Sequence, residues 1–174
     1  QAQQQNALWL PEVAQIRNPR LLKSLTVYLR QLGVRFIEHA LITGIETTED
    51  RVVALTTTQH RWQFQHLVLA AGAWTTQLIK QLLPDVQQDL QVKPVKGQML
   101  LFAAPADLLS CMVLDGDRYL IPRADGRILA GSTVEDVGFD KTTTAAARDA
   151  LYQFAVDLLP ALKHYGVEAH WAGL

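Results

Sequence analysis

The chain has 174 residues, of which 49% are hydrophobic, and its 16 basic and 17 acidic side chains give a formal charge of -1. This composition is typical of a globular protein and excludes a disordered chain, while the balanced charge gives no reason to expect a nucleic-acid or membrane partner. No apolar run approaches the roughly 20 residues that cross a bilayer. The single cysteine, Cys111, can form no internal disulfide, so we expect a cytoplasmic protein.

The first half of the chain predicts a helix, a meander and a strand-turn-helix. Residues 1–6 are a polar stub that we expect to be disordered. Asn18 as a cap and Pro19 predict the start of a helix that buries a leucine stripe and ends at Gly33. The expected meander, with a turn at Glu49–Asp50, consists of Val34–Ile37, Ala40–Glu46, Val52–Thr57 and Trp62–Phe64. After it we expect a strand buried on both faces, a glycine turn and a helix: Leu67–Ala71, Gly72 and Trp74–Leu83.

The second half, which follows a connector at Pro84–Asp89, predicts an antiparallel sheet with a helix across one face. The strands expected before the helix are Gln98–Phe102, Met112–Leu114, Arg118–Pro122 and Arg127–Gly131. The last two form a hairpin, because the Asp125-Gly126 pair between them favours positive φ. Thr142–Thr144 offer caps to a helix that Pro160 ends, with the stripe Ala147, Ala150, Leu151, Phe154, Ala155, Leu158 and Leu159. Val167–Trp171 is the final strand, and the fold class is a mixed α+β fold.

Two groups of residues invite a functional interpretation, and each also has a plain structural one. The run Leu67–Trp74 ends in small residues and a glycine, which suits close approach of the backbone to a dinucleotide, or simply a core strand with a tight turn. Tyr119 lies beside Arg118 and Arg123, which suits a carboxylate, or sheet packing next to solvated arginines. The five histidines are dispersed, so we expect no metal, and Asp115-Gly116-Asp117 reads as a β-turn.

The motifs together resemble the D-amino-acid oxidase superfamily, and within it the glycine oxidases of the thiamine pathway. They occur in family order: Val68-Leu-Ala-Ala-Gly-Ala-Trp74, Pro94-Val-Lys-Gly-Gln98, Tyr119-Leu-Ile-Pro-Arg123, Asp125-Gly-Arg127, Gly131-Ser-Thr133, Glu135-Asp-Val-Gly-Phe-Asp140 and Trp171-Ala-Gly-Leu174. The resemblance runs from about residue 7 to residue 174. It implies an FAD-dependent enzyme that oxidises the C–N bond of glycine or another small amino acid or amine, with hydride transfer to the flavin and oxygen as the acceptor.

The resemblance also implies domains and site residues. Residues 7–91 would belong to an FAD-binding domain of the glutathione-reductase type, and residues 92–174 to a substrate domain built on an antiparallel sheet. Ile42 matches a position whose backbone meets the adenine side of FAD, and Ala70, Ala71 and Gly72 lie near the dinucleotide. Tyr119 matches a substrate-binding tyrosine, and Val134 falls where an apolar pocket residue is expected. None of these residues would be catalytic in the sense of transferring a proton.

The chain departs from the family by what it lacks. It has neither the N-terminal glycine-rich turn that meets the FAD pyrophosphate nor the carboxylate-binding arginine expected directly after Trp171-Ala-Gly-Leu174, and Arg118 and Arg123 do not replace that arginine. We therefore expect a central segment of a longer enzyme, which alone would hold no FAD and show no activity. Whether the enzyme forms a homo-oligomer stays open.

Other interpretations remain at this point. A related hydroxy-acid dehydrogenase or the oxidase of a tRNA-modifying enzyme would share the Pro94–Gln98 and Tyr119 regions, although the near-neutral charge argues against RNA. In a different class, the chain would be a ligand-binding or scaffold module that kept the sheet and lost the cofactor. An exposed apolar face would favour the enzyme, and a polar, finished surface would favour the module.

Overall fold

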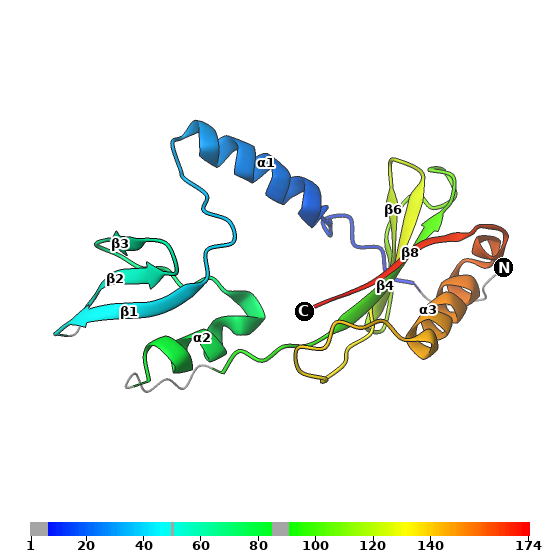
Figure 1. The fold of residues 1–174 in the computed structure, drawn as a ribbon. Helices are drawn as coiled ribbons and strands as arrows, with labels where there is room; N and C mark the ends of the chain where they lie inside the picture. The colour runs from blue at the N-terminus through cyan, green and yellow to red at the C-terminus, as the bar shows by residue number, and fades with distance from the viewer. Residues whose placement is uncertain (1–6, 50, 85–90) are drawn as a thin grey trace. The chain divides into compact units, whose positions relative to one another are not determined.

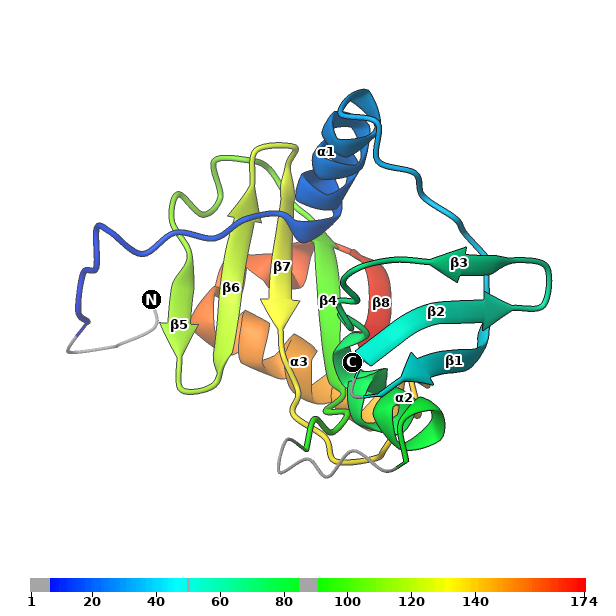
Figure 2. The ribbon, with the colours of Figure 1, turned by 90° about the vertical axis from the view of Figure 1, so that its left-hand side faces the viewer.

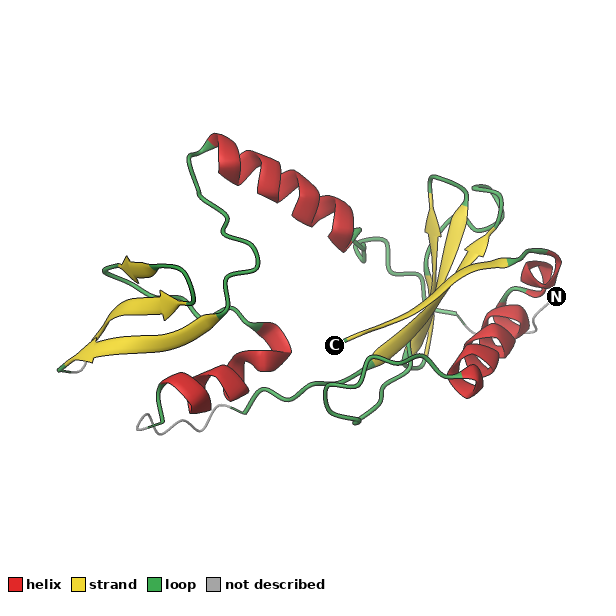
Figure 3. Ribbon diagram, viewed as in Figure 1, coloured by secondary structure: helices red, strands yellow, loops and turns green. Residues whose placement is uncertain are grey.

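The computed structural model describes residues 7–49, 51–84 and 91–174 (Figure 1). The expected stub at residues 1–6, the expected turn residue Asp50 and residues 85–89 of the expected connector lie outside the described part. The described chain falls into two compact units, which divide between Leu69 and Ala70. Both combine helices with antiparallel strands, which confirms the mixed α+β class (Figure 3). The assignment of residues 7–91 to FAD and of residues 92–174 to the substrate stays a prediction.

Helix α1 spans Asn18–Gln31, close to the predicted bounds. The cap position is Arg17, not Asn18, and no side chain caps the helix. Pro19 is the second residue of the helix and not the first, as was expected. It is tolerated there because the first four N–H groups of a helix have no partner within the helix. Gly33 ends the helix with φ +82, the left-handed conformation that glycine adopts easily.

The prediction that α1 buries a leucine stripe is wrong. The helix has no buried residue, and Leu22 and Leu32 are 62% and 61% exposed. The strand predicted at Val34–Ile37 is also wrong, since this segment is a loop with Phe36 41% exposed beneath the Arg30 guanidinium. In both cases the apolar pattern is present, but the described part of this unit supplies no element to cover it or strand to pair with it.

The predicted meander is confirmed as a three-stranded antiparallel sheet. Its strands run in the order β1 (Ile42–Thr48), β2 (Arg51–Thr57) and β3 (Arg61–Gln63). The Arg61 guanidinium donates to both oxygens of Glu46, at 2.6 and 2.7 Å, and so ties β3 to β1 across β2. This ion pair therefore links the two edge strands of the sheet.

The buried strand predicted at Leu67–Ala71 is absent. These residues form a loop, and the Val68 side chain is 84% exposed. A strand buried on both faces needs strands on either side, and the described residues place none beside it. The glycine turn and helix that should follow are present, as a 3-10 turn at Gly72–Trp74 and as α2 at Thr75–Leu82.

The second unit is built on a five-stranded antiparallel sheet with the strand order β5-β6-β7-β4-β8 (Figure 2). The strands are β4 (Gly97–Ala103), β5 (Val113–Asp115), β6 (Arg118–Arg123), β7 (Arg127–Gly131) and β8 (Val167–Gly173). The predicted β6–β7 hairpin is confirmed, with Gly126 at φ +79 in its turn. Asp115-Gly116-Asp117 is the expected turn, with Gly116 at φ +57.

Helix α3 (Ala145–Leu158) lies across one face of this sheet, as predicted (Figure 2). Its N-cap is Thr144, whose hydroxyl accepts from the Ala147 N–H at 3.3 Å. Leu151 and Ala155 are fully buried against three strands, in a core that includes Leu100, Leu120, Ala130, Phe102, Ile128 and, from the 3-10 turn Pro160–His164, Leu162. One member of the predicted stripe, Ala150, is exposed instead.

Candidate active site on the sheet face opposite α3

Sheet register places Tyr119 on the face that points away from α3. Leu120 pairs with Ala130, and Ala130 with Leu100, and all three are buried against α3. Because successive residues of a strand point to opposite faces, the neighbouring row faces the other way. That row consists of Tyr119, Gly131, Met99 and Trp171 on β6, β7, β4 and β8. We call this side the tyrosine face.

The Tyr119 ring lies directly over Gly131. A Cβ built on Gly131 would lie 2.8 Å from the Tyr119 hydroxyl and 2.9 Å from two ring carbons. Such distances are not tolerated between real atoms, so only glycine leaves room for the ring here. The phenol therefore extends from β6 across β7, towards the strand that carries Met99.

Two more glycines continue this surface. Gly97 lies two residues before Met99 on β4 and pairs with Gly173 on β8, so both share the tyrosine face. We call Gly97, Gly131 and Gly173 the glycine floor, since none of the three carries a side chain of its own. The Tyr119 ring covers Gly131 and Ser132 lies beside Gly97, whereas a Cβ on Gly173 would meet nothing within 4 Å. Beside the open backbone at Gly173 a small substrate or a flat ring can approach closely, whereas a larger side chain would fill the space.

Val134 belongs to the segment that follows β7. Glu135 pairs with Lys96 through two backbone hydrogen bonds of 2.9 Å, and the Thr133 N–H donates to the Gln98 carbonyl at 3.2 Å. The side chains of Thr133 and Glu135 both accept hydrogen bonds from Gln98, the first from its backbone N–H and the second from its side-chain amide. In an extended segment the residue between them points the opposite way, so Val134, 71% exposed, faces the tyrosine face.

Behind that segment, a buried polar cluster holds it in place. We call Lys96, Gln98, Thr133 and Glu135 the lysine cluster. The Lys96 ammonium, 2% exposed, is 3.0 Å from the Glu135 carboxylate and 3.5 Å from Asp140, and donates to the Thr142 carbonyl at 3.1 Å. The Gln98 amide, 0% exposed, donates to Glu135 at 2.7 Å. In the described residues no buried side-chain polar atom lacks a partner.

The electrostatics of the lysine cluster favour the charged forms. The hydrogen bond from the Thr133 hydroxyl, more than the ammonium beside it, holds the pKa of Glu135 below its usual value. The bond to Glu135 raises the pKa of Lys96. Two hydrogen bonds from Thr142 lower the pKa of Asp140. The ammonium and both carboxylates are therefore ionised near neutral pH, and none is set up to exchange protons with a substrate.

β8 closes the cluster on its other side. The His170 Nε2 lies 3.0 Å from the Gln98 side-chain oxygen, which also accepts from the Thr144 N–H at 3.0 Å. Burial, with a smaller effect of the Arg148 charge, lowers the pKa of His170. The neutral ring thus links β8, β4 and the start of α3, the elements that carry the tyrosine face.

The residues predicted to meet FAD lie in both units. Ile42 is the half-buried first residue of β1, and Ala70, Ala71 and Gly72 lead into the 3-10 turn before α2. Gly72 adopts φ +54, and a Cβ placed on it would meet nothing within 4 Å. The backbone at Gly72 is therefore bare and accessible, which fits the close approach of a dinucleotide. Their assignment to FAD stays a prediction.

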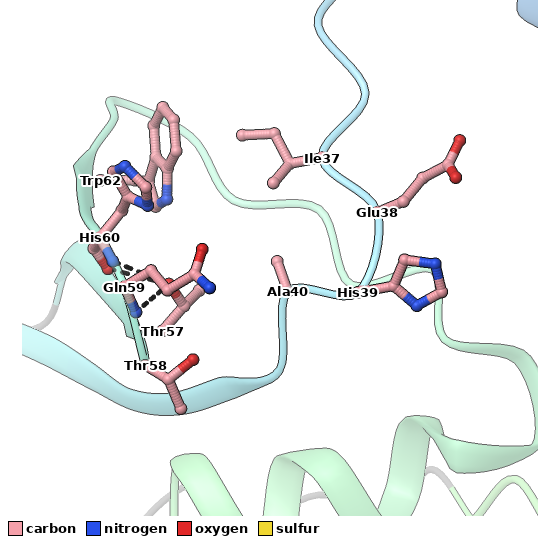
Figure 4. Close-up of a pocket in the computed structure, with 9 residues that line it drawn as sticks. All are labelled: Ile37, Glu38, His39, Ala40, Thr57, Thr58, Gln59, His60 and Trp62. Carbon is pink, nitrogen blue, oxygen red and sulfur yellow. Dashed lines mark hydrogen bonds between the residues drawn. The ribbon is translucent and has the colours of Figure 1, made fainter.

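The first unit also has a small depression of about 170 Å³, which contains none of the predicted site residues (Figure 4). The loop before β1 and the turn between β2 and β3 form it. Within it, the Thr57 hydroxyl accepts from the N–H groups of Gln59 and His60 at 3.3 and 3.0 Å. Its lining is Ile37, Glu38, His39, Ala40, Thr57, Thr58, Gln59, His60 and Trp62. These contacts stabilise the turn and bring no reactive groups together.

Sequence reasoning missed the glycine floor and the lysine cluster. Gly97 and Gly173 become neighbours only through the β4–β8 pairing, which no local pattern indicates. Lys96 and Gln98 did leave a signal, because they share the alternation of Leu100 and Phe102, which are buried against α3. Polar residues in phase with a buried strand face indicate a satisfied internal network.

Comparison with known proteins places the chain in a family. Residues 2–174 match the family DAO, FAD dependent oxidoreductase. The glycine oxidase of Pseudomonas putida is 46% identical over 170 residues, and that of Pseudomonas aeruginosa is 44% identical over 171 residues. These alignments cover 97% and 98% of this chain but 46% of each relative, so the chain spans about half the length of the curated relatives it matches.

A solved structure agrees with the sequence matches. The crystal structure of a glycine oxidase from Bacillus cereus superimposes with a TM-score of 0.81 at 27% identity, covering 90% of this chain and 43% of that one. The resemblance inferred from the motifs is thus confirmed in sequence and in fold. The chain belongs to the FAD dependent oxidoreductase family.

Proposed function

We propose that the full-length protein carrying this chain oxidises the C–N bond of glycine or another small amino acid or amine to an imine. The observation that supports this most is the tyrosine face, where the Tyr119 ring lies over Gly131 and the backbone at Gly173 is open. Its relatives at 44% and 46% identity are named glycine oxidases. One phenol next to glycine backbone, with Met99 and Trp171 on the same face, suits a substrate of a few atoms.

FAD is the proposed cofactor of the full-length protein. The backbone at Gly72 is open, and Ala70 and Ala71 are small, so the residues present fit the approach of a dinucleotide there. Ile42 would contribute its backbone from β1. When bound, FAD supplies the acceptor for the hydride of the substrate and passes the electrons on to oxygen. We further propose that residues 7–91 serve the cofactor and residues 92–174 the substrate.

The residues of this chain orient the substrate. The Tyr119 hydroxyl donates a hydrogen bond to the substrate carboxylate, which fixes the Cα above the glycine floor. Val134 provides an apolar boundary on the same face and excludes water from the reacting carbon. Neither side chain carries a proton away, so their loss weakens binding more than it slows the chemical step.

The alternative of a non-catalytic module has less support. Large apolar side chains are exposed on α1 and before it, with Leu22 at 62% and Trp9 at 69%. A finished binding module would cover them.

Among the described residues no helix has the length and apolar character needed to cross a membrane. A cytoplasmic location stays our proposal, based on the free thiol of Cys111.

The test is to purify the full-length protein and record its absorption spectrum before and after glycine is added without oxygen. We expect a yellow flavin spectrum that glycine or sarcosine bleaches, and hydrogen peroxide when air is admitted. Bleaching by glycolate or lactate but not by glycine would instead identify a hydroxy-acid dehydrogenase. A colourless protein that takes up no FAD would contradict the enzyme and leave the binding module.

The role of Tyr119 is tested within the same assay. Tyr119→Phe removes the hydroxyl, and we expect KM for glycine to rise roughly tenfold, about 1.4 kcal/mol of binding energy, with kcat changed much less. Tyr152→Phe is the matched control, because Tyr152 stacks on Phe102 from α3, on the opposite side of the sheet. If both variants behave alike, Tyr119 does not bind the substrate.

A further inference from the structure

The lysine cluster is more elaborate than the stability of the sheet requires. The Lys96 ammonium and the Gln98 amide are nearly removed from solvent, while the Glu135 carboxylate is 24% exposed, and a buried charge is costly unless its hydrogen bonds are made. A set of apolar side chains would fill the same space at less cost. The cluster lies directly behind Val134, on the other side of the same extended segment.

The connections of the cluster show which movement it prevents. Gln98 lies on β4 and Lys96 directly precedes it, while Thr133 and Glu135 flank Val134 on the segment after β7. The backbone N–H of Gln98 donates to the Thr133 hydroxyl at 2.9 Å, and its side-chain amide donates to the Glu135 carboxylate at 2.7 Å. Lys96 bridges Glu135 to Asp140 and to the Thr142 carbonyl, which closes the loop that follows.

The β7 register changes immediately before this segment. Met99 pairs with Gly131, so without a shift Gln98 would lie opposite Ser132, but the Thr133 N–H donates to the Gln98 carbonyl. One residue, Ser132, is therefore extra. A bulge of this kind interrupts the hydrogen bonds between the two strands and changes the direction of the side chain that follows. The polar contacts of the lysine cluster stabilise the segment where its backbone pairing is interrupted.

We propose that Lys96 and Glu135 are positioning residues that hold Val134 over the tyrosine face and thereby set the size of substrate that the enzyme accepts. The inference rests on the proposed function. Lys96 and Glu135 point towards α3 and do not touch the substrate. They act by fixing the segment Thr133–Glu135, in which the Lys96–Glu135 pairing puts Val134 opposite Gly97 in the register.

The experiment uses the full-length protein with bound FAD and two variants of the cluster. Lys96→Met keeps the length of the side chain and removes its charge and donors. Glu135→Gln keeps the shape and an oxygen that can accept from Thr133 and Gln98, and it removes the charge and replaces the acceptor next to Lys96 with an amide NH2. The matched control is Arg127→Met, which breaks the two hydrogen bonds of 2.7 and 2.9 Å to Glu168 at the other end of the same strands.

The first readout is kinetic, with glycine and the bulkier N-ethylglycine as substrates. For Lys96→Met we expect KM for glycine to rise roughly tenfold while kcat stays within about twofold, and the preference for glycine over N-ethylglycine to fall roughly tenfold. Glu135→Gln shifts the preference in the same direction by less. Arg127→Met keeps the wild-type preference even if it lowers the melting temperature. An equal loss of preference in Arg127→Met, or none in Lys96→Met, would overturn the proposal.

The second readout needs no activity. Amide hydrogen exchange of a peptide covering residues 132–142 should speed up at least tenfold in Lys96→Met and stay at the wild-type rate in Arg127→Met. Unchanged exchange in Lys96→Met would refute the positioning role whatever the enzyme does. Faster exchange in a protein that oxidises no small amine would leave the positioning role standing and refute the proposed function instead.

Discussion

At the residue scale, the placement of Tyr119 depends on the absence of a side chain at Gly131. Gly131→Ala would put a methyl group 2.8 Å from the phenol oxygen, so the ring must move. We predict that KM for glycine rises roughly tenfold, since a displacement of about 1 Å weakens an oriented contact strongly. Gly166→Ala, where a Cβ meets nothing within 4 Å, should leave KM unchanged. Peroxide release at varied glycine concentrations measures both, and equal KM values would refute the contact.

The second prediction at this scale concerns His170. Because burial lowers the pKa of His170 in the folded state, the unfolded chain takes up a proton first, near the ordinary value of about 6.5. The stability that the neutral ring provides is thus present above that value and lost as the pH falls through the folded pKa. When the pH is lowered from about 7 to about 5, the free energy of unfolding should fall less in His170→Gln than in the wild type.

Urea denaturation at the two pH values measures this difference. The control is His164→Gln, at an exposed position in the 3-10 turn after α3, which should keep the wild-type slope. A wild-type slope in His170→Gln as well would mean that the ring does not stay neutral next to Gln98.

Residue roles could be predicted only where a local motif carried them. Tyr119 and Gly131 stand out in the sequence through their neighbours, but their contact depends on strand pairing over twelve residues of chain. For Lys96 the alternation with Leu100 and Phe102 indicates the buried face of the strand. Its partners Glu135, Asp140 and Thr142 are about forty residues away, so no local pattern identifies them.

At the element scale, the start of α3 contributes both to stability and to the site. Thr144→Ala removes the cap acceptor for the Ala147 N–H and should lower the free energy of unfolding by about 1 kcal/mol. Thr144→Ser keeps the hydroxyl and should restore it. Thr143→Ala, one residue earlier and exposed, should change stability by less than about 0.5 kcal/mol. Urea denaturation of the full-length protein checks the order, and equal effects at both threonines would contradict the cap.

The elements that were predicted correctly carry a local signal of their own. The β6–β7 hairpin and the meander follow from turn residues between strands that are close in sequence. Helix α3 follows from its cap and its periodicity, although the β4 residues that it packs against lie far away in the sequence. The strands expected at Val34–Ile37 and Leu67–Ala71 have the right composition but no neighbouring strand in the described residues. A strand is defined by pairing, so composition alone overestimates it.

At the scale of the whole molecule, the apolar face of α1 predicts how the 174-residue chain behaves by itself. Leu22, Leu25 and Leu32 are 62%, 43% and 61% exposed. We expect the chain alone to bind a hydrophobic dye and to aggregate, and Leu22→Gln with Leu25→Gln to reduce both. Light scattering and dye fluorescence measure this. A monodisperse chain without dye binding would indicate an independent module.

The most direct test of the account is a crystal structure of the full-length protein with FAD and glycolate, which has the shape of glycine but carries a hydroxyl in place of the amine. We predict the ligand carboxylate within hydrogen-bond distance of the Tyr119 hydroxyl, above Gly97 and Gly131, with Val134 beside it. Glycolate on the α3 side of the sheet, or away from Tyr119, would contradict the proposed site.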